Sequence, residues 1–303
     1  MSAADHNHDH SDHSHHHALP DTADGRRRTA IAALLTFCFM IAEVIGGLVS
    51  GSLALLADAA HMLTDAGSLG LAWLGFRLAE HPADDRRSFG WARFKVLAAF
   101  VNGLALIVLA IWIAFEAIGR LMAPQPVMGD LLLGVAIIGL VVNCFVFWVL
   151  HGGDQADLNM QGALWHVAGD LLGSVAAIAA AIVILMTGWM PIDPLLSLVV
   201  AIIITLGGYR LVRKTGHILI EGVPEGLSAT AIKQDLERHV QGAEHVDHIH
   251  AWALNESKAL VTVDVTASAG ASPEVIRRSV KARLKTRFGV EHATVEVIST
   301  DTG

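Results

Sequence analysis

The sequence predicts an α-helical membrane protein with six transmembrane helices followed by a small cytoplasmic α+β domain. Three observations support this fold class. The chain of 303 residues is 53% hydrophobic and only 17% charged, and its mean hydropathy is +0.51, which is more apolar than a soluble domain usually is. Several apolar runs reach the length of about 20 residues that a helix needs to cross a bilayer. From about Gly216 onward the runs stop and strand-like alternation begins.

Six apolar runs define the predicted membrane domain, residues 25–215. They cover about residues 29–49, 53–78, 94–121, 127–150, 163–187 and 195–212. Basic residues precede the first run, fill the connection between the second and third, and follow the sixth: Arg26, Arg27, Arg28, Arg86, Arg87, Arg93, Lys95, Arg210, Arg213 and Lys214. Because basic residues beside a span stay in the cytoplasm, both termini are expected there. Cys38 and Cys144 lie within apolar runs without C-x-x-C spacing, so we interpret them as small core residues rather than as a disulfide.

The first 24 residues are expected to form a disordered cytoplasmic tail, residues 1–24. This stretch is polar and holds seven of the 17 histidines, namely His6, His8, His10, His13, His15, His16 and His17. A His-rich tract of this composition indicates metal collection. An affinity tag is the alternative, but the irregular spacing of the histidines among Asp5, Asp9 and Asp12 argues against it.

Residues 216–303 predict a two-layer domain with the element order α-β-β-α-β. Ser228 is expected to cap a helix that runs to Val240, and residues 246–254 and 259–267 alternate as two strands around a turn. Ser272 and Pro273 are typical of a helix start, and a last strand is expected over residues 293–299. So small a domain would gain buried core from dimerisation.

Two five-residue stretches inside apolar runs each place a histidine four residues before an aspartate. They are His61 to Asp65 in the second run and His166 to Asp170 in the fifth. Residues four apart share one face of a helix, so the two stretches together offer two imidazoles and two carboxylates. Zn²⁺ takes four such ligands in tetrahedral geometry. Ionisable groups at bilayer depth are costly and usually functional, which favours a shared cation site over hydrogen bonds between helices.

Other classes of function lack their motifs or fit less well. The chain has no H-E-x-x-H helix and no P-loop, which argues against a zinc protease or an ATP-driven enzyme, and no extended basic patch indicates nucleic acid. A metal-gated channel would need weaker, multiple sites. A membrane-bound metal sensor would use the C-terminal domain and would not need ligands inside the membrane. Asp58, three residues before His61, is interpreted either as a helix-packing carboxylate or as one that supports the metal ligands, because a fifth ligand is not needed.

The chain resembles members of the cation diffusion facilitator family. The resemblance rests on residues 52–65 (S-L-A-L-L-A-D-A-A-H-M-L-T-D), 88–93 (S-F-G-W-A-R), 116–120 (E-A-I-G-R), 164–174 (L-W-H-V-A-G-D-L-L-G-S), 221–224 (E-G-V-P) and 246–252 (V-D-H-I-H-A-W). These motifs occur in order, and the similarity extends over nearly everything after the tail.

The resemblance implies a homodimeric divalent-cation/proton antiporter that exports metal from the cytoplasm, and a cytoplasmic domain similar to a metallochaperone. The compact loops and the six-span layout suggest a bacterial protein and hence the inner membrane. His61, Asp65, His166 and Asp170 match the four transport ligands of the family. A histidine with an aspartate in both spans resembles the zinc-preferring branch, with cobalt or cadmium as alternative substrates. Protons would compete with the metal for these ligands, so a proton gradient would drive export.

The chain departs from the family at two further metal positions. In the loop after the second span, Arg87 and Trp91 stand beside Asp84 where some relatives have histidines, so no metal is expected there. In the cytoplasmic domain, carboxylates stand near the relatives' histidine positions, and a metal site is a weaker expectation at Asp247, His248, His250, Asp264 and Glu296. Arg93 and Glu221 occupy the positions of a salt bridge that locks the dimer in some relatives, although both could be solvated surface charges.

Overall fold

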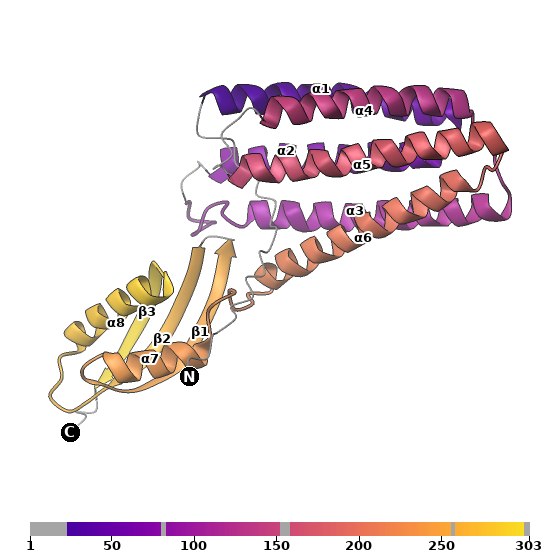
Figure 1. The fold of residues 1–303 in the computed structure, drawn as a ribbon. Coiled ribbons are helices and arrows are strands. Elements are labelled where there is room, and N and C mark those ends of the chain that lie inside the picture. The colour runs from indigo at the N-terminus through magenta and orange to yellow at the C-terminus, as the bar shows by residue number, and fades with distance from the viewer. Residues whose placement is uncertain (1–22, 80–82, 152–157, 256–257, 300–303) are drawn as a thin grey trace, which may run out of the picture. The chain divides into compact units, whose positions relative to one another are not determined.

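The computed structural model of the chain describes residues 23–79, 83–151, 158–255 and 258–299. Six long helices come first (Figure 1). They are α1 (Ala23–Ser50), α2 (Leu53–Ala79), α3 (Phe94–Met122), α4 (Gly129–His151), α5 (Leu158–Thr187) and α6 (Ile192–Leu219). The interpretation of residues 1–24 as a disordered tail falls outside the described residues, except that α1 begins at Ala23.

Five of the six helices contain apolar stretches long enough to cross a membrane. The remaining one is α2, whose described apolar stretch, Leu53–Thr64, is shorter, although the helix itself runs for 27 residues. The surface of these helices carries many exposed large apolar side chains, such as Phe115 at 78% and Met186 at 80% exposure. Such a surface needs lipid rather than water around it. The multi-pass membrane fold is therefore confirmed, and the count of six spans is supported in part.

Three membrane helices extend well beyond the predicted apolar runs. The first starts at Ala23, six residues before the expected 29. The fifth helix starts at Leu158, five residues before the expected 163. The sixth runs from Ile192 to Leu219 rather than over 195–212, because Pro194 is tolerated in a first helical turn and the polar residues after Val212 continue the helix. Cys38 and Cys144 are free and exposed on α1 and α4, so their interpretation as core residues was wrong.

Small residues bring α1, α2 and α4 close together. A methyl group at Gly139 of α4 would collide with the ring of Phe39 on α1, and one at Gly47 of α1 would collide with Leu56 of α2. Close approach at small residues is how helices pack tightly in a bilayer. Buried apolar clusters continue this packing: Phe39 and Met40 of α1 meet Met62 of α2, and α4 also packs along α5.

The α+β domain has the predicted order, with α7 (Ala229–His239), β1 (Ala243–Asn255), β2 (Lys258–Ala267), α8 (Pro273–Phe288) and β3 (His292–Ser299). Ser228 caps α7 through its side chain, which accepts from the backbone N–H of Ala231. The sheet order is β1-β2-β3, with β1 antiparallel to β2 and β3 parallel to β2. The parallel pair requires a crossover, which α8 supplies. Both helices share one core with the sheet, which includes Ile232, Leu236, Val263, Val280 and Leu284.

A bulge interrupts β1 in the middle of its pairing with β2. The register shifts between Asp247, opposite Asp264, and His250, opposite Thr262. His248 lies in this bulge with a φ of +47°, a left-handed conformation that few residues other than glycine adopt. The bulge turns His248 toward β2, where its Nδ1 lies 2.9 Å from Oδ2 of Asp264.

Candidate metal transport site

The start of α2, which carries the first ligand pair, is held by a buried carboxylate from α6. Asp193 is fully buried and accepts hydrogen bonds from the Ser52 hydroxyl and from the backbone N–H groups of Leu53, at 2.8 Å, and Ala54, at 3.4 Å. Ser52 in turn caps the N–H of Leu55 at 3.2 Å. The first N–H groups of a helix have no partner within the helix. Asp193 and Ser52 satisfy three of them and fix where α2 begins.

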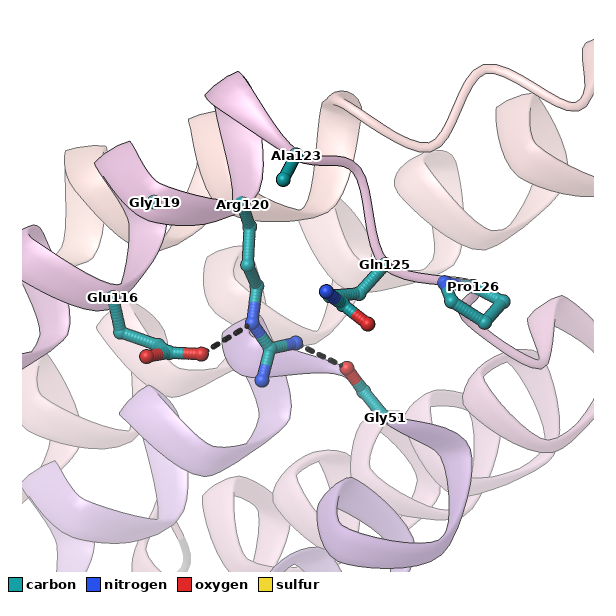
Figure 2. Close-up of a pocket in the computed structure, with 7 residues that line it drawn as sticks. All are labelled: Gly51, Glu116, Gly119, Arg120, Ala123, Gln125 and Pro126. Carbon is teal, nitrogen blue, oxygen red and sulfur yellow. Dashed lines mark hydrogen bonds and ion pairs between the residues drawn. The ribbon is translucent and has the colours of Figure 1, made fainter.

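The turn between α1 and α2 is also held from α3. The Arg120 guanidinium donates through Nη1 to the Gly51 carbonyl oxygen and through Nε to Glu116 Oε1 at 2.9 Å (Figure 2). The N–H of Met128, before α4, donates to the Ser50 carbonyl oxygen at 2.9 Å. Arg120, Glu116 and Gly51 line a hollow of about 400 Å³ together with Gly119, Ala123, Gln125 and Pro126. The turn that sets the position of α2 is thus hydrogen-bonded to three other segments.

The four predicted transport ligands lie on the predicted helices. His61 and Asp65 belong to α2, and His166 and Asp170 belong to α5. His61 is half-buried and Asp170 is buried, at 9% exposure. The side chains of Asp65 and His166 lie outside the described residues. Within the described residues no three His, Cys, Asp or Glu side chains gather as a metal centre.

Contacts one turn away establish how α2 and α5 run past each other. Gly173 of α5 faces Asp58 of α2, because a methyl group at Gly173 would lie 3.9 Å from both carboxylate oxygens of Asp58. Nearer the start of α2, Leu55 packs in one cluster with Ala181 and Ile184 of α5. The order of these contacts shows that α2 and α5 run antiparallel. Gly173 and Asp58 each lie three residues from a ligand, Asp170 and His61 respectively.

Glu43 on α1 is a polar residue that the sequence interpretation missed. It is only 2% exposed, and its carboxyl group lies close to that of Asp58 on α2. Its Oε2 is buried and makes no hydrogen bond within the described part of the chain. The signal was present in the sequence, because Glu43 is the only charged residue in the apolar stretch Ala30–Ser50. Ionisable groups at bilayer depth are usually functional, which is why His61 and Asp170 were predicted as ligands, and the same reasoning applies to Glu43.

A hydrogen bond also joins α4 to α5 near these residues. Asn143 is 3% exposed and donates to the Ser174 hydroxyl at 3.2 Å. Ser174 lies one turn beyond Asp170 on α5. Between Asp130 and His151, α4 contributes no charged side chain.

The weaker candidates in the cytoplasmic domain are distributed over the sheet. Asp247, Asp264 and Glu296 are in register across the three strands, and His248 contacts Asp264. Asp247 also forms an ion pair with Lys233, at 2.8 Å, and the hydrogen bond from Lys233 lowers the pKa of Asp247. His250 lies beyond the bulge, in a hollow that also contains arginines. A metal site at these residues stays a prediction.

Arg93 and Glu221 form an ion pair within the chain, with 3.0 Å between Arg93 Nη2 and Glu221 Oε1. Their side chains are 36% and 62% exposed, so the pair contributes little to stability by itself. Glu221 follows the last residues of α6 with a φ of +63°. This left-handed residue ends α6.

Comparisons with known proteins agree with these features. The family model of the cation efflux transmembrane domain matches residues 29–220, and that of the cation efflux protein cytoplasmic domain matches residues 224–297. The zinc transporter ZitB of Pectobacterium atrosepticum is 42% identical over 285 residues, which cover 94% of this chain and 88% of that protein. ZitB of Escherichia coli is 40% identical, covering 94% and 92%.

A third relative has a broader name. The cadmium, cobalt and zinc/H(+)-K(+) antiporter of Bacillus subtilis is 40% identical over 273 residues, which cover 88% of this chain and 87% of that protein. All three relatives match over nearly their whole length, and the transmembrane model alone spans most of this chain. The chain therefore belongs to the cation diffusion facilitator family of cation efflux proteins.

Proposed function

We propose that this chain is a secondary transporter that exports zinc from the cytoplasm in exchange for protons. The zinc ion would bind between α2 and α5 through His61, Asp65, His166 and Asp170. Zinc is the named substrate of the ZitB relatives, and imidazole with carboxylate is a ligand set that suits it.

The proximity of Gly173 to Asp58 is the observation that carries this proposal, because a methyl group at Gly173 would lie 3.9 Å from the Asp58 carboxylate. In an antiparallel pair, a step of one turn forward on α2 corresponds to one turn backward on α5, about 5.4 Å along each axis. One turn from Asp58 and Gly173 are His61 and Asp170, and one further turn leads to Asp65 and His166. Each level thus pairs one imidazole with one carboxylate across the two helices, which supports a single four-ligand site.

Exchange of metal for protons needs no other catalytic group. A histidine must be neutral and an aspartate ionised to bind the metal, so metal binding releases protons and protonation releases metal. Two carboxylates balance the two charges of Zn²⁺ in a place where water is scarce. Export then requires that the site opens alternately to the two sides of the membrane.

The orientation and assembly of the protein belong to the same proposal. The basic residues after α2 and at the end of α6 support a cytoplasmic location for those ends and for both termini, and the bacterial relatives favour the inner membrane. The cytoplasmic domain would pair with a second copy, because dimerisation increases the buried core of so small a domain.

The test is zinc flux into proteoliposomes that contain the full-length protein, with and without an imposed pH gradient. The proposal predicts saturable zinc uptake that depends on the gradient and is accompanied by proton movement in the opposite direction. Zinc binding without flux would indicate a sensor, and unsaturable flux without proton movement would indicate a channel. Parallel assays with Co²⁺ and Cd²⁺ would rank the substrates.

A further inference from the structure

A basic hollow is lined by the connection between α2 and α3, the segment after α6, and the strands β1 and β2, and it contains none of the predicted transport ligands. Its volume is about 760 Å³. Its lining includes three arginines and one glutamate, namely Arg86, Arg87, Arg93 and Glu221. The excess of positive charge stands out in a chain whose formal net charge is −8.

The arginines differ in how far their hydrogen-bonding groups are already used. Arg87 pairs with Asp84 at 3.2 Å, and its guanidinium lies 3.9 Å from the ring centroid of Trp91. Desolvation by itself would raise the pKa of Asp84. Hydrogen bonds from the backbone N–H groups of Arg86 and Arg87 outweigh this effect, so the pKa of Asp84 is lowered. Asp84 is therefore an ionised partner that fixes Arg87 in place.

Arg86 and Arg93 retain donors for a ligand. The Arg86 side chain is exposed and forms no ion pair within the described residues. Arg93 uses Nη2 for Glu221, but its Nε is buried and donates to no acceptor in the described part of the chain. A buried N–H without an acceptor is costly, so an oxygen-bearing ligand at this position would remove that cost.

Part of the hollow is formed by the segments that directly follow or precede membrane helices. Arg86, Arg87 and Arg93 fall between the end of α2 at Ala79 and the first turn of α3 at Phe94. Glu221 and Val223 directly follow the end of α6 at Leu219. Both α3 and α6 are apolar enough to span a bilayer. Lipid phosphate groups lie near the ends of membrane-spanning helices, and basic pockets there bind anionic headgroups.

Apolar side chains complete the wall of the hollow. Phe89 and Val223 are 47% and 43% exposed, and Ile249, Trp252 and Leu254 also line it. A free phosphate ion has no apolar part that could pack against these side chains. A glycerophospholipid presents both a phosphate and an apolar glycerol-acyl portion, so it matches the two kinds of lining.

We propose that this hollow binds the phosphate group of an anionic phospholipid, with Arg86 and the Nε of Arg93 as donors. Guanidinium groups bind phosphate through parallel, charge-assisted hydrogen bonds. This site is independent of the metal ligands and does not require that the chain transport zinc. The lipid would hold the connection between α2 and α3 beside the end of α6.

Lipid titration of the purified full-length protein tests the proposal. The measurement is the shift in thermal unfolding midpoint with added phosphatidylglycerol or phosphatidylcholine, for the native chain, Arg86→Gln and a matched control, Arg238→Gln. Arg238 is an exposed arginine on α7 outside the hollow. Phosphatidylglycerol should raise the midpoint more than phosphatidylcholine, and Arg86→Gln should weaken its apparent affinity about fivefold, whereas Arg238→Gln should not.

Three results would overturn the assignment. Equal shifts with both lipids would show that the phosphate charge is not recognised. An equal loss in Arg86→Gln and Arg238→Gln would show that only net charge matters. If millimolar inorganic phosphate raised the native midpoint as much as phosphatidylglycerol did, and lost this effect in Arg86→Gln, the ligand would be soluble phosphate rather than lipid.

Discussion

The membrane helices and the cytoplasmic domain use ionisable side chains in opposite ways. In the helices three carboxylates are buried, Glu43, Asp170 and Asp193, at 2%, 9% and 0% exposure. In the α+β domain ionisable side chains are many and mostly exposed; the side chain of Asp247 is 59% exposed and that of His248 is 81% exposed. A buried charge is costly unless it is paired with another group or binds an ion, whereas a surface charge is hydrated by water. The position of a polar residue therefore indicates a functional role far more strongly in the membrane helices than in the α+β domain.

Replacement of Asp193 should give the largest loss of stability away from the metal ligands. Asp193→Ala would leave the N–H groups of Leu53 and Ala54 and the Ser52 hydroxyl without their acceptor, at a cost of about 2–3 kcal/mol. Thermal unfolding of the purified protein measures this. Asp130→Asn, at an exposed carboxylate in the first turn of α4, is the control. Equal midpoints for both variants would mean that the hydrogen bonds between Asp193 and the start of α2 do not stabilise the protein.

Replacement of Glu43 should affect transport more than folding. The Glu43 carboxyl group lies close to that of Asp58, which precedes His61 by three residues. Loss of a residue that supports metal ligands typically costs about tenfold or more. We expect Glu43→Gln to lower the initial zinc flux by about tenfold, with a nearly native unfolding midpoint. Native flux in this variant would reduce Glu43 to a packing residue and weaken the contrast between the two regions.

Surface pairs in the cytoplasmic domain should matter less, and their effect should depend on pH. Two hydrogen bonds from Arg283, both 2.7 Å, hold Asp235 and lower its pKa. A depressed pKa gives stability that is present above the ordinary aspartate range and is lost as the pH falls through the folded-state pKa. Asp235→Asn should flatten this acid dependence, measured as amide hydrogen exchange in α7 from pH 6 to pH 3. An unchanged slope would show that the pair contributes nothing.

The smallest effect is expected at His248, whose contact with Asp264 is solvent-exposed. His248→Ala should change stability by less than about 0.5 kcal/mol and leave zinc flux at the native level. Unfolding with and without added zinc provides the check. A zinc-dependent stabilisation that disappears in His248→Ala would instead establish a metal site in the cytoplasmic domain. It would then no longer hold that only the membrane helices use ionisable side chains to bind metal.

The sequence allowed prediction wherever local chemistry decides the structure. Ser228, Pro273 and the alternation of the strands gave the order and approximate bounds of the α+β elements, and apolar length gave the membrane helices. The ends of α5 and α6 were missed because polar residues continue a helix beyond the apolar run. The bulge at His248 was missed because nothing in the local sequence requires it.

The candidate site was predictable only in part. His61 and Asp170 could be found because each is a polar residue in an apolar run with a partner four residues away. Glu43 has no such partner along its own helix, since Asp58 lies on α2, and it was overlooked. The hydrogen bonds between Asp193 and the start of α2 span about 140 residues of sequence, and no local pattern connects the two ends.

Zinc flux under an imposed pH gradient, measured for the native chain, Asp65→Ala and Asp170→Ala, tests the central claim most directly. Both variants must first be shown to unfold at near-native temperatures. One four-ligand site between α2 and α5 predicts that each substitution abolishes gradient-driven flux, although the two residues lie about 100 positions apart in the chain. Flux at the native level in either folded variant would contradict the site and direct attention to the cytoplasmic histidines.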